Sequence, residues 1–233
     1  MSQPAKRFYE RAHATEETAG WSVRLDERLL KTPAQRELLL PVAALAEAVA
    51  EEWTAQTEDI RPHTMPLTQL AFTAVDRVGP ERAAIVEQTA RFGETDMVCY
   101  RADEPPDLVV MQAEVWDPVL DWARGEFGVD FRLTTGIVPV SQPEETVPRL
   151  AERLDTLDDY RLAAVTLAAQ ASGSLLVALA MTSGALATDD AVVAAQLDET
   201  FQARLWGLDY EAEMRLAGLA GDIRTAARFL RLL

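Results

Sequence analysis

The sequence is poor in the residues on which most catalytic and metal sites depend. Its 233 residues include a single cysteine, Cys99, and two histidines, His13 and His63. One cysteine excludes an intramolecular disulfide and a thiolate zinc site within the chain, and it fits a reducing, cytoplasmic compartment. Neither histidine stands at helical spacing from another ligand type, so zinc, di-iron and Ser-His-Asp sites all lack members. We therefore expect no metal, no cofactor and no catalytic residues.

Phosphate-binding motifs are missing as well. Neither Gly-x-Gly-x-x-Gly nor Gly-x-x-x-x-Gly-Lys occurs, which argues against nucleotide binding by the usual phosphate cradles. The chain carries 22 Lys and Arg against 38 Asp and Glu, a formal net charge of −16. Such an acidic field repels phosphate backbones and anionic lipid headgroups, so we expect no nucleic-acid partner. An acidic protein of this kind suits a basic or aggregation-prone protein client.

Charged residues are absent between Leu162 and Thr188, which raises the question of a membrane span. Alanine supplies many of the apolar residues there, and Ser, Thr, Gln and Gly interrupt them, so transfer into lipid would gain little. We expect a buried central helix, broken near Gly173 or Gly184, and no membrane insertion. The N-terminus shows no apolar signal segment and no transit peptide, which predicts a chain that is neither exported nor imported.

The first sixty residues combine strand and helix patterns. Residues 21–25 alternate apolar and polar side chains, and Asp26-Glu27 marks a turn before a second short run at 28–31, which predicts a β-hairpin. Residues 37–40 add a third short apolar run. The helix that follows begins at a proline, which suits a first helical position, and its apolar stripe must bury against the strands. That stripe consists of Val42, Leu45, Val49 and Trp53.

Beyond the prolines at 62 and 66 the pattern is mainly helical. We therefore expect an α+β protein with a small N-terminal sheet-and-helix domain at residues 1–60 and a larger, mainly α-helical domain at residues 61–233. Residues 131–133 and 137–140, with Gly136 between them, are expected to form short strands or an extended crossing. Gly79-Pro80 predicts a helix stop, and Asp117-Pro118 predicts the start of a new helix. The expected helices are 67–78, 81–92, one from Pro106, one from Pro118, 147–157, 162–181, 191–205 and 209–232.

Paired carboxylates are the one pattern that points to an enzyme. Asp117 and Asp121 stand four residues apart, as do Asp209 and Glu213, so either pair could share a helix face and raise one pKa. A small hydrolase or isomerase is the alternative that these pairs leave open. Solvated helix faces produce the same spacing, and Cys99 is expected to be a packing residue without a nearby histidine.

Residues 197–215 favour a binding surface instead. They join large aromatic side chains, a glycine break and dense acidity. Trp206 stands directly before Gly207 in this acidic setting, whereas Trp53, Trp116 and Trp122 fall on apolar stripes and are expected in the core. This stretch predicts a surface that grips another protein.

The chain resembles the Atp12 family of assembly chaperones for the F1 sector of ATP synthase. The likeness runs from Arg7 to the C-terminal helix and is carried by ordered blocks at residues 29–34, 50–56, 65–68, 94–101, 116–122, 173–175 and 197–215. Two departures stand out. Asp26-Glu27 replaces the family's usual Asp-Gly, which argues against a tight primed turn. Leu205 stands where a charged or polar residue is more usual.

The resemblance implies an ATP-independent chaperone, not an enzyme. It would bind the unassembled F1 α subunit, prevent its aggregation and hand it to the β subunit. It implies a bacterial cytoplasmic protein, with relatives in the mitochondrial matrix of eukaryotes, and we expect a monomer. A stable structural subunit of the synthase is a third possibility, which predicts permanent retention in the complex.

The resemblance also supplies a site. An acidic position after the Trp-Gly pair is linked to function in the family, and it matches Glu211 here, with Asp209 beside it. Trp206 and Glu213 complete the expected client-binding set. The competing interpretation is that Glu211 only forms an ion pair with Arg215 along the last helix.

Overall fold

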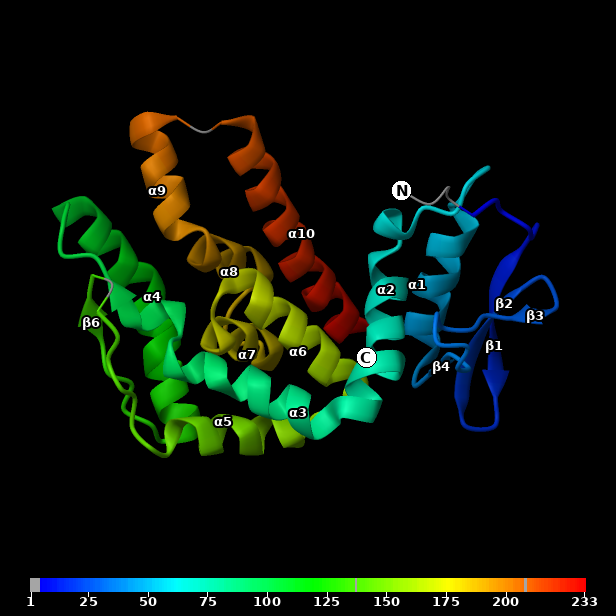
Figure 1. Cartoon of the computed structure of the whole chain (residues 1–233), viewed down its shortest axis with the longest axis horizontal. Coiled ribbons are helices and arrows are strands. Elements are labelled where there is room, and N and C mark those ends of the chain that lie inside the picture. Colours follow the sequence, from blue (N-terminus) through cyan, green and yellow to red (C-terminus); the bar gives the residue numbers. More distant parts are fainter. Residues whose placement is uncertain (1–4, 137, 208) are drawn as a thin grey trace. The chain divides into compact units, whose positions relative to one another are not determined.

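The structure is a computed structural model that describes residues 5–136, 138–207 and 209–233. It confirms the α+β class, with a small antiparallel sheet near the N-terminus and helices through most of the rest. The chain forms two compact units (Figure 1). Unit 1 comprises residues 1–82, 158–163 and 228–233, and unit 2 comprises residues 83–157 and 164–227. The domain division at residues 60 and 61 stays a prediction, because a compact unit need not fold independently.

The sheet of unit 1 is built around β2 (Gly20–Leu25), which pairs with three other strands. These are β1 (Ala12–Glu17), β3 (Arg28–Leu29) and β4 (Leu39–Leu40). Helix α1 (Ala43–Thr54) packs on β1 and β2 and buries Leu45, Val49 and Trp53. The predicted hairpin is therefore confirmed, and three of the four residues of the predicted stripe are buried. Val42 is only half-buried, and Pro41 does not begin the helix, because Val42 is the N-cap and Ala43 the first helical residue. Strand β1 was not predicted, because its side chains are mostly small or polar.

The turn between β2 and β3 is tight despite the missing glycine. Leu25 pairs with Arg28, so Asp26 and Glu27 alone connect the strands. Asp26 takes φ +54°, and its carboxylate accepts hydrogen bonds from the amides of Glu10 and Arg11 at 3.1 and 2.9 Å. Two residues therefore suffice for the turn. The positive φ falls on Asp26, which its side-chain hydrogen bonds hold, and not on Glu27, which stands where the family usually has glycine.

The break predicted at Gly79-Pro80 is a kink at Glu81 rather than a full stop, because helical hydrogen bonding continues past Gly79. After the short η1 (Pro62–Thr64), α2 (Pro66–Thr73) continues through the π-helical η2 (Ala74–Val78) into α3 (Gly79–Ala90). The amide of Gly79 bonds to the carbonyl of Ala74, five residues back, and Glu81 leaves helical geometry at φ −113°. The wider π turn and this kink accommodate a proline that an ideal helix would exclude.

Unit 2 is helical apart from two short parallel strands, β5 (Tyr100–Arg101) and β6 (Thr134–Thr135). β6 falls between the two runs predicted to be extended, residues 131–133 and 137–140, and Ile137 lies outside the described residues. Pro118 does not start a helix, because it lies inside α4. The remaining segments are η3 (Arg91–Glu94), η4 (Met97–Cys99), α4 (Pro106–Phe127), α5 (Thr146–Asp155), α6 (Asp159–Ser172), α7 (Leu175–Ser183), α8 (Thr188–Ala195), α9 (Leu197–Trp206) and α10 (Tyr210–Leu232).

The uncharged stretch forms the buried centre of unit 2. Gly173 and Gly184, at φ +71° and +79°, end α6 and α7 as predicted, and α7 is apolar on nearly every side. No described helix combines the length and the apolar character needed to cross a bilayer. The helix predicted at 191–205 is two helices, because Gln196 departs from helical geometry between α8 and α9.

Candidate protein-binding surface

Helices α9 and α10 form a hairpin whose turn lies at the end away from α7 (Figure 1). Helix α9 closes with a hydrogen bond from the Gly207 amide to the Ala203 carbonyl at 2.9 Å. Gly207 takes φ +81°, a conformation that L side chains rarely adopt, so glycine is needed to leave the helix in this direction. Leu208, next in the chain, lies outside the described residues.

The first turn of α10 carries three acidic side chains with different local roles. Asp209 caps the helix: its Oδ1 accepts from the Ala212 amide at 2.8 Å, and its carbonyl accepts from the Glu213 amide at 3.0 Å. Glu211 and Glu213 lie in the first turn, where the helix dipole favours negative charge. All three side chains are exposed. Asp209 therefore has a structural role of its own, whereas Glu211 and Glu213 keep their carboxylates in solvent.

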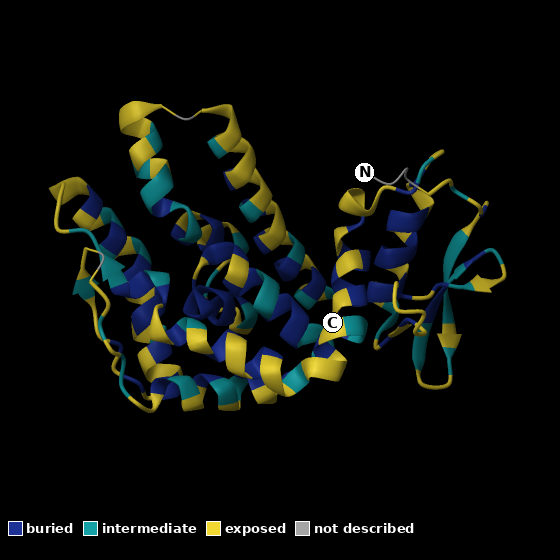
Figure 2. Ribbon diagram, in the orientation of Figure 1, coloured by how far each residue is buried: buried dark blue, intermediate teal, exposed yellow. Residues whose placement is uncertain are grey.

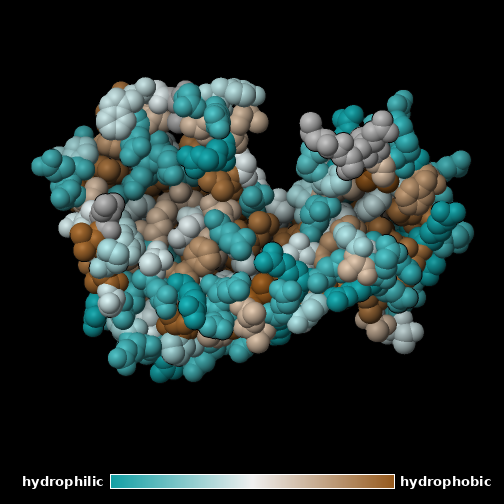
Figure 3. All heavy atoms as spheres, viewed as in Figure 1, coloured by the Kyte–Doolittle hydropathy of each residue, from teal (hydrophilic) through white to brown (hydrophobic). Residues whose placement is uncertain are grey.

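Large apolar side chains surround this acidic turn without being buried. Trp206 is 78% exposed and Tyr210 is 76% exposed. Leu205 and Met214 are each more than half exposed. Figure 2 shows this end of the hairpin as mostly exposed, and Figure 3 shows apolar spheres there beside hydrophilic ones. Exposed aromatic residues next to polar groups are typical of surfaces that bind proteins.

The opposite end of the hairpin is anchored. Gln196 Nε2 donates to the Leu216 carbonyl at 2.6 Å, and Arg215 lies 4.0 Å from Glu199 across the two helices. From α4, Gln112 Nε2 donates to Asp198 Oδ1 at 2.7 Å. These contacts join the start of α9 to the second turn of α10, while Trp206 and Tyr210 remain in solvent. Among the described residues Arg215 pairs with Glu199 and not with Glu211. The ion pair between Glu211 and Arg215, on which the purely structural interpretation of Glu211 depends, is therefore not formed.

The structure thus brings Trp206, Asp209, Glu211 and Glu213 to one exposed end of unit 2, and their role in binding stays a prediction. Sequence reasoning did not single out the exposure of Tyr210 and Met214. The 3.6-residue period of the helix could have predicted this exposure. The buried side of α10 consists of Leu216, Ala220, Ile223 and Ala227, which leaves Tyr210 and Met214 on the other side.

The carboxylate pairs do not form an acid–base site. Asp117 bonds to Arg101 at 2.8 Å, and Asp121 bonds to Arg124 at 2.6 Å. Each carboxylate therefore faces its own cation in an exposed position, an arrangement that does not make the two share a proton. The other pair contains Asp209, which already caps α10. These contacts do not support the hydrolase or isomerase alternative.

Asp96 is a buried carboxylate with a structural function. It has no exposed surface, and burial raises its pKa to about 6 against hydrogen bonds from Ser174 and backbone amides. Its oxygens accept from the amides of Val98 at 3.3 Å and Leu176 at 3.0 Å. It thereby satisfies amide groups at the start of α7, which have no partner inside the helix. A substrate could not reach it.

The remaining candidates also belong to the core. Cys99 is fully buried and burial raises its pKa to about 12, which confirms the prediction of a packing residue. Trp53 and Trp116 are buried as predicted, whereas Trp122 is only partly buried. Within the described ranges no three His, Cys, Asp or Glu side chains cluster as metal ligands would.

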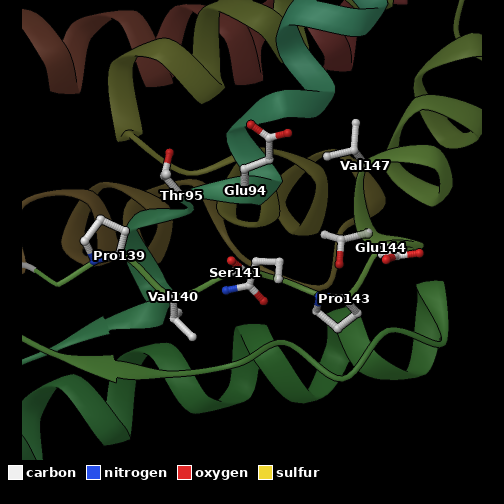
Figure 4. Close-up of a pocket in the computed structure, with 10 residues that line it drawn as sticks. Glu94, Thr95, Pro139, Val140, Ser141, Pro143, Glu144 and Val147 are labelled. Carbon is white, nitrogen blue, oxygen red and sulfur yellow. The ribbon is translucent and has the colours of Figure 1, made fainter.

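A cavity of about 420 Å³ lies between η3 and the segment that leads into α5. Figure 4 shows Glu94, Thr95 and Ser141 among its lining side chains. Its ten lining residues include no histidine, cysteine or lysine, so nothing in its wall offers the Ser141 hydroxyl a histidine base. The cavity thus lacks a Ser-His or Cys-His pair, and the ionisable side chains in its wall are the carboxylates Glu94 and Glu144.

Comparisons with known proteins agree on one family. The model of the ATP12 chaperone protein family matches residues 6–124. Atp12 from Paracoccus denitrificans has a solved structure with 40% sequence identity and a TM-score of 0.92, covering 98% of each chain. The Atu1473 protein of Agrobacterium tumefaciens is 37% identical with a TM-score of 0.91, covering 97% of this chain and 85% of that one.

A more distant relative extends the agreement to eukaryotes. The protein atp12, mitochondrial, of Schizosaccharomyces pombe is 26% identical over 220 residues, which span 89% of this chain and 76% of that protein. The resemblance seen in the sequence blocks is confirmed. The chain belongs to the ATP12 family of chaperones, which act in ATP synthase assembly.

Proposed function

We propose that the protein is an ATP-independent assembly chaperone that binds the unassembled α subunit of F1 and hands it to the β subunit. The observation that carries the proposal is the exposed aromatic and acidic end of the α9–α10 hairpin in a chain of the ATP12 chaperone family. The sequence contains no usual phosphate-binding loop, which favours a mechanism without nucleotide. We propose that it acts as a monomer in the bacterial cytoplasm.

Competition from the neighbouring subunit explains how such a chaperone could release its client without nucleotide hydrolysis. Isolated subunits of a ring expose large apolar interfaces, and such surfaces associate wrongly unless they are covered. A chaperone that covers the surface used by the proper neighbouring subunit is displaced when that neighbour binds more tightly. The exposed Trp206 and Tyr210 side chains would bury apolar area on the client, and the acidic turn would select basic or donor groups.

The direct test is suppression of aggregation. Denatured F1 α subunit is diluted into buffer with the protein at a near-stoichiometric ratio and without nucleotide, and light scattering is followed. We expect scattering to fall markedly, and an unrelated acidic protein of similar charge to have no such effect. A strict requirement for ATP, or equal suppression by the control protein, would contradict the proposal.

The role of Glu211 can be tested by charge reversal. Glu211→Lys should weaken client binding, because reversing a charge that meets a cation across an interface can cost several kcal/mol of affinity. Its effect on the free energy of unfolding should be small, about 0.3–1 kcal/mol, because only the helix dipole interaction is lost. A binding assay beside a denaturation curve separates the two effects.

Asp190→Lys is the matched control, since Asp190 is an exposed acid in the first turn of α8. It should cause a similar small loss of stability and leave binding unchanged. If Glu211→Lys binds the α subunit as the wild type does, the assignment of Glu211 is wrong. If it unfolds the protein, Glu211 is structural.

A further inference from the structure

The exposed side of α10 carries small and apolar residues over about three turns. One side of α10 is buried in unit 2. Five residues on the opposite side recur at spacings of three and four, so they share one face, and all five are exposed. The residues of this face, hereafter the α10 face, are Tyr210, Met214, Ala217, Gly218 and Gly221.

Within the described part of the chain, no close packing contact requires glycine at Gly218 or Gly221 of the α10 face. A Cβ atom added at Gly218 or Gly221 would meet no described atom within 4 Å. Neither residue has a positive φ, so the backbone does not require glycine. Glycine inside a helix is less stable than alanine. The chain therefore carries two unfavourable helix residues that leave the α10 backbone open to close approach from outside.

Acidic side chains border the α10 face. Glu211 and Asp222 are eleven residues apart, close to three full turns, and so lie along the same edge of the helix. Neither forms an ion pair within the residues that the structure describes. The two arginines near the face are occupied: Arg215 pairs with Glu199, and Arg224 lies 3.1 Å from Asp189. The unpaired charge along this edge is thus negative.

We propose that the α10 face is the docking site for one helix of the client, which lies along α10 with a small or apolar stripe and flanking Lys or Arg side chains. The identity of the client, the F1 α subunit, rests on the function proposed above. A helix fits this face better than a strand, because the backbone of α10 is hydrogen-bonded within itself and offers no edge to extend. Small residues let two helices approach closely, and basic flanks would meet Glu211 and Asp222.

A steric block tests the close approach. The double substitution Gly218→Leu and Gly221→Leu fills the α10 face while leaving the helix intact, since leucine favours helix more than glycine does. Gly125→Leu in α4 is the matched control, because Gly125 is also exposed and also has no described atom within 4 Å of its added Cβ. We expect both variants to melt no lower than wild type.

Binding to isolated F1 α subunit separates the outcomes. The α10 double variant should lose at least tenfold in affinity, whereas Gly125→Leu should bind as wild type does. Wild-type affinity in the double variant would overturn this inference and leave the proposed function standing. Failure of the wild type itself to bind the α subunit would overturn both.

Cross-linking tests that the occupant is a helix. Ala217→Cys places a reactive thiol on the α10 face, and the chain's other cysteine, Cys99, is fully buried, so a thiol-specific photo-crosslinker attaches at one position. The linked positions on the α subunit should repeat every three or four residues within one helix that also carries Lys or Arg. Links confined to strands, or scattered over the subunit, would overturn the helix assignment.

Discussion

Unit 2 contains two regions that each carry a tryptophan but differ in exposure, the packing layer of α4, α7 and α8 and the end of the α9–α10 hairpin. In the first, Trp116 is 1% exposed and its Nε1 donates to the Ala194 carbonyl at 3.0 Å. In the second, Trp206 lies in solvent. An apolar side chain stabilises the fold only where folding removes it from water. The first region thus holds unit 2 together, and the second is available to a partner.

The same contrast separates two aspartates at helix starts. Asp96 is buried below α7, and Asp209 is exposed at the start of α10. Both accept hydrogen bonds from backbone amides at the beginning of a helix. Only the buried one must give up hydration of its charge, so its pKa moves. Burial therefore couples the protonation of Asp96 to folding, whereas Asp209 caps its helix with its carboxylate exposed to solvent.

Truncating the buried tryptophan should have the largest effect. Trp116→Ala removes a fully packed indole and leaves the Ala194 carbonyl without this donor, so we expect a loss of about 3–5 kcal/mol in the free energy of unfolding. Denaturant unfolding followed by circular dichroism measures the loss. An unchanged midpoint would show that the layer of α4, α7 and α8 does not carry the stability assigned to it.

The sequence predicted the buried region better than the exposed one. Trp116 was expected in the core from its apolar stripe, and the uncharged stretch was expected to break near Gly173 or Gly184, where α6 and α7 end. Local rules failed at Pro118, which lies inside α4 instead of starting a helix. The cap between Asp96 and Leu176 was not predictable, because eighty residues separate its partners in the chain.

The candidate surface shows a different limit of sequence reasoning. The aromatic and acidic composition of residues 197–215 drew attention to the hairpin, and the family resemblance selected Glu211. Neither could tell which apolar side chains fold inward. Leu197 and Leu216 are buried, whereas Leu205 and Met214, similar residues on the same two helices, are exposed. That difference depends on where the two helices contact the rest of unit 2.

Titration of Asp96 should change the free energy of unfolding by less than the Trp116→Ala substitution does. Its folded pKa of about 6 lies above its usual value of 3.8, so the folded state binds the proton more tightly than the unfolded state does. Its contribution to stability is full below pH 3.8 and is lost as the pH rises through 6. This rise in the pKa of Asp96, from 3.8 to about 6, corresponds to at most about 3 kcal/mol in the free energy of unfolding.

The measurement is the free energy of unfolding between pH 3.5 and 7 for wild type and Asp96→Asn, because the difference between the two curves removes the titration of the other carboxylates. The difference should change with pH in this window and level off above it. Parallel curves for wild type and Asp96→Asn would show that Asp96 is not coupled to folding.

Truncating the exposed tryptophan should have the smallest effect on stability and a large one on binding. Trp206→Ala removes a side chain that is already in water, so the free energy of unfolding should stay within about 0.5 kcal/mol of wild type. If the hairpin end grips the F1 α subunit, a buried interface tryptophan should contribute about 2 kcal/mol or more to affinity, roughly a thirtyfold change. Phe8→Ala is the control, since Phe8 is an exposed aromatic of unit 1 and should affect neither quantity. Equal weakening by Phe8→Ala would mean that the client binds any exposed aromatic side chain, and a marked loss of stability in Trp206→Ala would place this residue with Trp116 in the packing of the fold.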